Sequence, residues 1–486
     1  MSDGLLLFAP VGLPLAGAAL TAMLRRHRHI CRWTMEITVL LLAFASLQLF
    51  LKVREGYILT TRFGGWPEPF AISFRGDSFG ATLVLVTGLL ALAAMIYARA
   101  DIGARRRHAG FDPLFLGMLA AVNGAFLTGD LFNLYVWFEL MLVTALGLIT
   151  LDRRREQLDG AFRYAALSMV GATFILLGIA FIFAETGVLE MVEIGKQLAG
   201  RELTLSLVTG GALIFAGFAL KSGLFPLYFW LPASYPTAPI TASAIFAGLL
   251  TKAGFYACVR VMVTLFGVQT LPGFPLMFAL VAAGTMLMCV LGALAQTDLR
   301  RLLSWHIIAQ VGYMAMGLAI ASAIGIQSAI FYMVHSMIVQ TNLFLVAGAM
   351  ARADGTFDVR LAGGIVRSQP LLALLAAVPI LSLAGIPPFS GFWAKFMVIR
   401  SSFAVGLGWL GAVALFVSLL TIISMGSVWA QAFWQSRAAG LRARRVPPAM
   451  LMAIGLLSAA TLLIGLFPDT LWGIAGDAAL ATGARR

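Results

Sequence analysis

Long apolar stretches recur along almost the whole chain, separated by short polar segments rich in arginine. A helix that crosses a membrane needs about 20 consecutive apolar residues, and the chain reaches this length repeatedly. The pattern predicts an all-α, polytopic membrane protein with about fourteen transmembrane helices. We expect these spans near residues 4–22, 34–53, 78–98, 112–128, 131–151, 163–184, 203–230, 241–264, 274–296, 302–321, 326–349, 370–398, 404–430 and 448–468.

The polar segment 54–77 reads REGYILTTRFGGWPEPFAISFRGD and follows a different pattern. Two β-prone runs flank a turn that contains Gly-Gly and proline, which indicates a small β-hairpin outside the bilayer. Together with this hairpin, the first three spans form an N-terminal segment, 1–111. The first span lacks a basic segment before it and a small-residue cleavage site after it, so we interpret it as retained.

The composition excludes a water-soluble protein. Hydrophobic residues make up 60% of the 486 residues and charged residues 11%, against roughly 45–50% and about 25% in soluble domains. Cys31, Cys258 and Cys289 form no close pair along the chain. Their spacing argues against disulfides, metal centres and iron–sulfur ligation, so we expect no cofactor.

The basic residues predict an orientation. If the loop after the first span is cytoplasmic, the cytoplasmic loops hold 21 of the 34 Lys and Arg, the opposite side holds 10, and three lie inside spans. Loops rich in Lys and Arg stay in the cytoplasm. We therefore expect a bacterial inner-membrane protein with both termini and the hairpin on the periplasmic side, and with Arg153–Arg155 and Arg442–Arg445 facing the cytoplasm. These loops account for the net charge of +13, which does not indicate a nucleic-acid partner.

The three basic residues expected inside the membrane are all lysines, namely Lys221, Lys252 and Lys395, whereas every arginine is expected in a loop or at a span end. Arginine holds its proton under all practical conditions, but a lysine removed from water can release it. A path that takes up and releases protons needs the second kind of residue. This pattern is the strongest indication of function that the residues themselves give.

Two further polar sites lie in mid-span. Glu139 is a lone acid among apolar residues, and a charge at the centre of a span costs at least ~2.5–3.5 kcal/mol, so a partner is expected. Pairing with Lys221 would form a switch, because a nearby carboxylate keeps the lysine protonated and its departure frees the proton. His335 lies in a polar cluster that can hold water and relay protons, formed with Ser336, Gln340, Thr341 and Asn342. A second interpretation is that the buried lysines and the acid form ion pairs that only hold helices together.

Prolines break two of the expected spans. Pro226 follows Lys221 by five residues, and Pro388 precedes Lys395 by seven; in a membrane such breaks are tolerated where the freed backbone groups line a cavity or find new partners. The sequence GLFPLYFW from Gly223 is echoed by GIPPFSGFW from Gly385, 162 residues and five spans later. An odd number of spans inverts the second copy. We therefore expect two inverted five-helix repeats, at 112–264 and 274–430, followed by a C-terminal helix and tail at 431–486.

Four stretches carry a family resemblance: GDLFNLYVWFE, LKSGLFPLYFWLPASYPTAPITASAIFAGLLTKAGFYACVR, RRLLSWHIIAQVGYMAMG and GIPPFSGFWAKF. They resemble the proton-translocating, antiporter-like subunits shared by complex I, membrane-bound hydrogenases and Mrp-type cation/proton antiporters. The resemblance covers nearly the whole chain. LFNLYVWFE and FGGWPEPF are most similar to the D-type subunit of the Mrp complex.

The resemblance implies a role for each buried charge. Glu139 matches the family's glutamate of span 5, Lys221 its lysine partner in span 7, and Lys252 the linking lysine of span 8. Lys395 matches the charged residue of span 12 near one exit, and His335 lies where the family has a histidine in span 11. One position departs from the pattern: this chain has VQT where we expect VKT, so Gln340 replaces a central lysine.

These observations leave three functions. The first is a proton-translocating subunit of an Mrp-type Na⁺/H⁺ antiporter, which implies other membrane subunits, H⁺ and Na⁺ as partners and a transporter rather than an enzyme. The second is a proton-pumping subunit of a redox-driven complex. The third is a scaffold that lost conduction at Gln340.

Overall fold

The computed structural model describes residues 3–64, 71–267, 273–436, 438 and 444–484. Helices make up most of this part of the chain, as the apolar pattern predicts. The longer helices are α1 (Asp3–Met23), α2 (Arg28–Arg54), α3 (Ser78–Asp101), α5 (Phe111–Leu127), α6 (Leu131–Ile149), α7 (Arg155–Thr186), α9 (Leu205–Ser222), α13 (Phe274–Leu294), α14 (Leu299–Ala319), α15 (Ala323–Asp354), α17 (Pro370–Ala384), α18 (Ser390–Ala404), α19 (Gly408–Trp429), α20 (Pro448–Leu466) and α21 (Pro468–Ala481). The short helical segments are α4 (Ala104–His108), α8 (Met191–Leu198), α10 (Leu231–Ser234), η1 (Tyr235–Thr237), α16 (Ile365–Ser368) and η5 (Ala430–Trp434).

One span is a composite of four segments. It runs from α11 (Ile240–Ile245) through η2 (Phe246–Leu250) and α12 (Thr251–Val259) to η3 (Arg260–Leu265). The η2 and η3 segments are π-helical turns, which interrupt the regular α-helical hydrogen-bond ladder and often occur at functional sites. We call the whole segment Ile240–Leu265 the central helix.

Within the described residues, 12 helical segments are long and apolar enough to cross a membrane. Two shorter apolar helices, α5 and α17, lie in the predicted spans 112–128 and 370–398. The helical, multi-span character is therefore confirmed, whereas the count of fourteen stays a prediction. A tail was expected after the last span, but α21 follows there and packs on α15, where the side-chain amide of Gln327 donates to the carbonyl of Trp472 at 2.8 Å.

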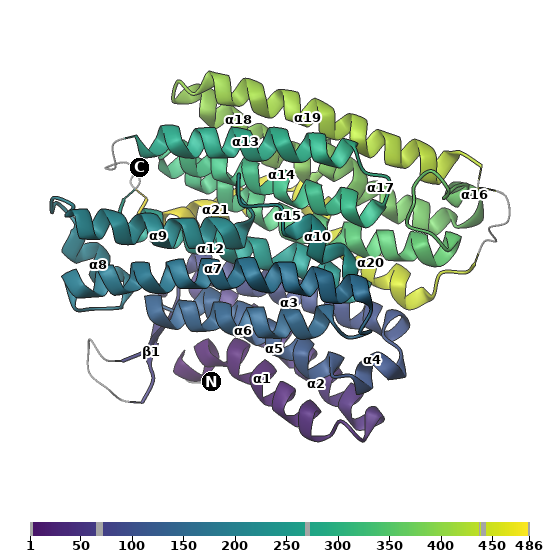
Figure 1. Cartoon of the computed structure of the whole chain (residues 1–486), viewed down its shortest axis with the longest axis horizontal. Coiled ribbons are helices and arrows are strands. Elements are labelled where there is room, and N and C mark those ends of the chain that lie inside the picture. Colours follow the sequence, from purple (N-terminus) through teal and green to yellow (C-terminus); the bar gives the residue numbers. More distant parts are fainter. Residues whose placement is uncertain (1–2, 65–70, 268–272, 437, 439–443, 485–486) are drawn as a thin grey trace.

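The long helices run side by side in roughly one direction, and the two ends of the bundle differ (Figure 1). One end carries β1 (Leu59–Arg62) and α8, and α21 also ends there. The other end carries α4 and α16. The central helix and α15 are buried along their whole apolar length, so they form the core of the bundle.

A two-stranded antiparallel sheet lies within the predicted hairpin 54–77. Strand β1 pairs with β2 (Ser73–Gly76) in a register that sets Leu59 opposite Gly76 and Arg62 opposite Ser73. Residues 65–70, which include the predicted Pro-containing turn, lie outside the described residues, as does Arg442. Asp77 directly follows β2. Its carboxylate accepts a hydrogen bond from the Gly80 amide at 3.0 Å and caps the start of α3.

Two helices end where the sequence predicts breaks. Helix α9 stops at Ser222 and is followed by Gly223 with φ of 77°, and α17 stops at Ala384 and is followed by Gly385 with φ of 87°. Both glycines adopt the left-handed conformation that other residues rarely accept. The peptide bonds Phe225–Pro226 and Pro387–Pro388 are cis, and both Pro226 and Pro388 are exposed on the outside of the bundle.

Candidate functional site

Glu139 and Lys221 lie on neighbouring helices without direct contact. The rings of Phe138 on α6 and Phe218 on α9, which lie close to these two charges in the sequence, pack against each other at a tilt of 49°, with centroids 5.1 Å apart. Lys221 is buried in the last turn of α9 and Glu139 is half-buried. The two charges interact electrostatically, but between these two described residues no nitrogen–oxygen distance is 4.0 Å or less. The structure therefore holds the predicted switch pair in a separated arrangement.

Lys252 is fully buried in the central helix. Its ammonium donates to the carbonyl oxygen of Ala247 at 2.7 Å. Ala247 lies in the π-helical turn η2, where the backbone ladder is interrupted, so a backbone dipole rather than a carboxylate receives the lysine. A lysine whose ammonium is bound by a neutral acceptor can release its proton to neighbouring groups more readily than a lysine held in an ion pair with a carboxylate.

Lys395 is held at the second helix break. Its ammonium donates to the carbonyl oxygen of Ala384 at 3.0 Å and to the hydroxyl of Ser418 at 3.1 Å. Ala384 is the last residue of α17, so its carbonyl has no helical partner and lies at the negative end of the helix dipole. A side chain at Gly385 would meet the Lys395 side chain at 2.9 Å. The break thus supplies both the acceptor and the space for this lysine.

His335 connects α15 to the same break. Its Nδ1 lies 2.8 Å from the hydroxyl of Ser390, which lies 3.1 Å from the hydroxyl of Ser382. The ring of Tyr332 packs edge-on against His335 and is stacked on Tyr313, over which the Lys395 ammonium lies 5.7 Å from the ring centroid. A continuous set of polar and aromatic groups therefore runs from His335 to Lys395.

The helices that carry Lys252 and His335, together with α14, hold buried polar atoms that have no hydrogen-bond partner within the described part of the chain. They are the Thr251 hydroxyl, the Gln310 amide nitrogen, the Ser336 hydroxyl, and both polar atoms of the Gln340 side chain. Helix α14 packs on both α12 and α15, and η2 of the central helix also packs on α15. Buried polar groups are normally satisfied by protein or by ordered water, so this region is polar enough to bind water.

Two predicted neighbours of Gln340 are engaged elsewhere. The hydroxyl of Thr341 donates to the carbonyl of Met337 at 2.8 Å. The amide of Asn342 donates to the hydroxyl of Ser458 at 2.9 Å, which ties α15 to α20. Thr341 and Asn342 therefore make structural bonds here, and Gln340 is the member of the trio whose polar atoms are both free of protein partners among the described residues.

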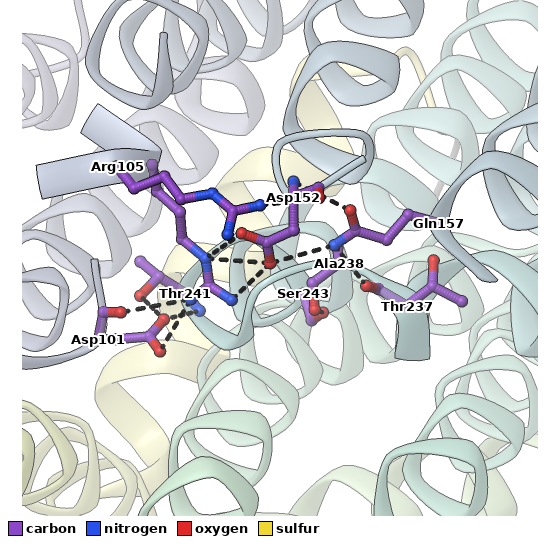
Figure 2. A network of polar contacts seen from close by, with 9 residues as sticks. Asp101, Arg105, Asp152, Gln157, Thr237, Ala238, Thr241 and Ser243 are labelled. Carbon is purple, nitrogen blue, oxygen red and sulfur yellow. Dashed lines mark hydrogen bonds and ion pairs between the residues drawn. The ribbon is translucent and has the colours of Figure 1, made fainter. Parts of the chain in front are cut away.

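A polar network holds the start of the central helix at the end of the bundle that carries α4 (Figure 2). Arg106 binds Asp152 with a nitrogen–oxygen distance of 2.7 Å, and Asp101 accepts from the backbone and hydroxyl of Thr241 at 3.0 and 2.7 Å. Gln157 donates to the carbonyl of Thr237 at 3.1 Å. The hydrogen bond from Arg106 lowers the pKa of Asp152. A pocket of about 350 Å³ adjoins this network.

The structure corrects one expectation about the arginines. Arg260 was expected at a span end, but it is only 5% exposed and belongs to the central helix. Its guanidinium binds Asp77 at 2.6 Å. The buried basic residues are therefore not all lysines. The partner could not be found from spacing, because Asp77 lies 183 residues away.

Several site residues could not be recognised in the sequence. Tyr313, Tyr332 and Gln310 look like ordinary core residues there, and only their contacts with one another and with Lys395 show otherwise. Ser390 could have been predicted as a site residue from the sequence, because it lies between the helix-breaking Pro388 and Lys395. The first break behaves differently from the second, since the carbonyl of Leu220 there accepts from the Trp230 indole at 3.1 Å.

The fold and this buried row of lysines define a membrane-embedded subunit of the ion-translocating class. The family model described as NADH:quinone oxidoreductase/Mrp antiporter, TM, matches residues 128–421, and the chain belongs to this family. Over 430 residues it is 38% identical to the D-type subunit of the Na(+)/H(+) antiporter of Alkalihalophilus pseudofirmus, covering 88% of this chain and 87% of the relative.

Solved structures agree with this assignment. A chain of the Mrp complex from Dietzia sp. superposes with a TM-score of 0.92 at 28% identity, covering 99% of this chain and 97% of that one. A chain of the archaeal membrane-bound sulfane sulfur reductase, described as a respiratory membrane complex, superposes with a TM-score of 0.90 at 26% identity, covering 98% and 97%.

Proposed function

We propose that this chain is the proton-translocating subunit of a multisubunit Mrp-type antiporter that exchanges H⁺ for a monovalent cation, Na⁺ in the first instance. The observation that carries the proposal is the buried polar row from Lys252 to Lys395, whose lysines rest on backbone carbonyls and hydroxyls rather than on carboxylates. The similarity to the D-type Na(+)/H(+) antiporter subunit supports the same cation pair.

In this mechanism a proton rests on Lys252, passes through bound water near Gln340 to His335, and reaches Lys395. Gln340 has no titratable proton, so its role is to order water with its amide. His335 hands on the proton through Ser390 toward the second break. The separated Glu139–Lys221 pair sets the charge state of the first half: approach of Glu139 favours protonated Lys221, and separation favours release.

The proposal includes the arrangement of the chain in the membrane. The helix ends at Gly223 and Gly385, 162 residues apart, support the division into repeats at 112–264 and 274–430, inverted with respect to each other. The arginine count supports a cytoplasmic position for the end that carries α4 and a periplasmic position for the end that carries β1. The other subunits of the complex and the lipid bilayer are then the neighbours of the outer helices.

The test is Na⁺-dependent proton movement in everted membrane vesicles from antiporter-deficient cells that express the whole complex. Adding Na⁺ should collapse a respiration-generated pH gradient in the wild type, and Lys252→Met should abolish this response while the complex still assembles. A Lys252→Met complex that responds as the wild type does would contradict proton passage through this chain.

A redox-driven complex is the second candidate, and the similarity to the sulfane sulfur reductase chain favours it. The two candidates differ in the energy source. Na⁺ alone drives proton movement in the first, whereas the second requires an electron donor and acceptor. A scaffold without conduction, the third possibility, predicts normal antiport in every variant of the buried lysines.

A further inference from the structure

A buried ion-pair cluster closes the central helix at the end of the bundle that carries β1. Arg260 donates to Asp77 at 2.6 Å and to the hydroxyl of Tyr256 at 2.9 Å. The Tyr256 hydroxyl in turn donates to the carbonyl of Phe126 at 2.8 Å. Asp77 is fully buried and Arg260 is 5% exposed. The Asp77 oxygen Oδ1 accepts from both Arg260 and the Gly80 amide, whereas its second oxygen, Oδ2, has no hydrogen-bond partner among the described residues.

Arg75 of strand β2 connects this cluster to the outside. Its guanidinium lies 3.6 Å from the carboxylate of Asp77, and its side chain is 25% exposed. Arg75 also lines a surface pocket of about 880 Å³, together with Lys196, Arg201, Val263 and Leu265. The cluster therefore lies between this pocket and the interior of the bundle.

The cluster and Lys252 share one helix. Lys252, Tyr256 and Arg260 are spaced by four residues each, so they lie along one side of the central helix, with Lys252 and Arg260 about 12 Å apart along its axis. A row of polar side chains thus leads from the buried lysine toward the pocket. One acid between two arginines leaves the cluster with a net charge of +1.

We propose that Arg260, held by Asp77 and backed by Arg75, is an electrostatic barrier that prevents a proton on Lys252 from leaving toward this pocket. The inference rests on the proposed function, because it assumes that Lys252 carries a transported proton. Arginine retains its charge and cannot serve as a station for a proton, and a fixed positive charge in a narrow path excludes protons and cations. The barrier directs the proton along α15 toward Lys395.

The competing explanation is that the ion pair only joins α3 to the central helix. Removing one partner of a buried pair destabilises a protein strongly in either case, so the test must change the charge without breaking the pair. Arg75→Glu does this, because Arg75 is partly exposed and the Arg260–Asp77 contact does not depend on it. It changes the net charge of the cluster from +1 to −1. Arg201→Glu is the matched control: it makes the same charge change in the same pocket at a residue that is 42% exposed and paired with Glu185.

The assay is the decay of an imposed pH gradient across liposomes that contain the purified complex, without Na⁺. Arg75→Glu should raise the initial rate of gradient decay about tenfold, which is the factor that a unit charge about 12 Å from Lys252 produces at an effective dielectric constant of about 20. Arg201→Glu should leave the decay at the wild-type rate. An assembled Arg75→Glu complex that is as proton-tight as the wild type would overturn the barrier. So would an equal leak in Arg201→Glu, because the pocket charge in general would then be responsible.

Three more variants complete the design. Asp77→Asn combined with Arg260→Gln leaves the net charge of the cluster at +1 through Arg75 but removes the fixed charge that lies on the same side of the helix as Lys252, so it should leak. Arg260→Lys keeps a positive charge beside Asp77 and should leak less than this double variant, but more than the wild type, because a lysine can release its proton. Adding Lys252→Met to Arg75→Glu should suppress the leak, because no proton then reaches the cluster. Failure of the proposed function can be distinguished from failure of the barrier. If the proposed function is wrong, the Lys252→Met complex retains Na⁺-coupled antiport, whatever the leak rate of Arg75→Glu.

Discussion

Replacing Gln340 by leucine distinguishes between two states of the region around this residue, a hydrated proton relay and a dry core. The two side chains have similar size, but leucine removes an amide whose oxygen and nitrogen both lack a partner among the described residues. Burying a polar group without a hydrogen bond costs about 1–3 kcal/mol in mutational data. In a dry site, Gln340→Leu would therefore raise stability by about that amount and leave transport intact.

We expect the opposite result, because Gln340 is not alone. Ser336 lies one helical turn earlier, and its hydroxyl is also unpartnered within the described chain, as are Thr251 and the Gln310 nitrogen. Four such side chains on packed helices would together cost several kcal/mol in a dry core, so we expect bound water to satisfy them. Gln340→Leu should then reduce Na⁺-driven proton movement at least tenfold and should not raise the thermal unfolding temperature.

Gln327→Leu is the matched control on the same helix. Its amide is satisfied by the carbonyl of Trp472 at 2.8 Å, so its loss should lower stability by about 1 kcal/mol while Na⁺-driven proton movement per assembled complex is retained. Antiport is measured in everted vesicles and unfolding by intrinsic fluorescence of the purified complex. Full antiport with a higher unfolding temperature in Gln340→Leu would refute the hydrated relay.

The remaining predictions address the other charged sites. Glu139→Ala and Lys221→Ala should each nearly abolish antiport in assembled complexes, and Lys221→Arg should fail as well because arginine retains its proton; substantial antiport in Lys221→Arg would show that a fixed charge suffices. His335→Ala should stop proton flux, and Gln340→Lys should be tolerated, because the family resemblance implies a lysine at this position; wild-type flux in His335→Ala would favour the scaffold. Single cysteines at Arg153–Arg155 should react with an impermeant reagent only after the membrane is opened, and labelling of intact cells would reject the orientation. Arg106 lowers the pKa of Asp152, so the stability that this carboxylate contributes is present above about pH 4 and is lost as the pH falls through the lowered pKa; unfolding of Asp152→Asn should show less acid dependence, and an unchanged profile would exclude the linkage.

The sequence predicts what depends on local signals. Apolar length places the helices, and the lone lysines and acid stand out because a charge in a span needs a reason. Gly223 and Gly385 could be expected at helix ends because proline follows each of them closely. The β-prone runs on either side of the Gly-Gly turn predict a hairpin within 54–77, where the structure has strands at 59–62 and 73–76; the side of the membrane on which they lie still depends on the arginine count.

Long-range partners could not be predicted. Arg260 looks like a span-end arginine until the hairpin brings Asp77 against it. The Ala384 carbonyl becomes a ligand for Lys395 only because α17 ends there and α18 returns beside it. The π-helical turns of the central helix were not predicted from any residue type in the sequence. In each case the missing information is tertiary contact.

The bond between Lys395 and Ala384 has a mechanical consequence. It joins α18 to the end of α17 across a break where the backbone ladder is absent, so it acts as a clasp between two half-helices. A protonated amine makes hydrogen bonds about twice as strong as those of a neutral one. Loss of the proton therefore loosens the clasp, and by thermodynamic reciprocity any movement that opens the break promotes loss of the proton. A neighbouring protein of the complex that pulls on α17 or α18 would therefore change the affinity of Lys395 for its proton.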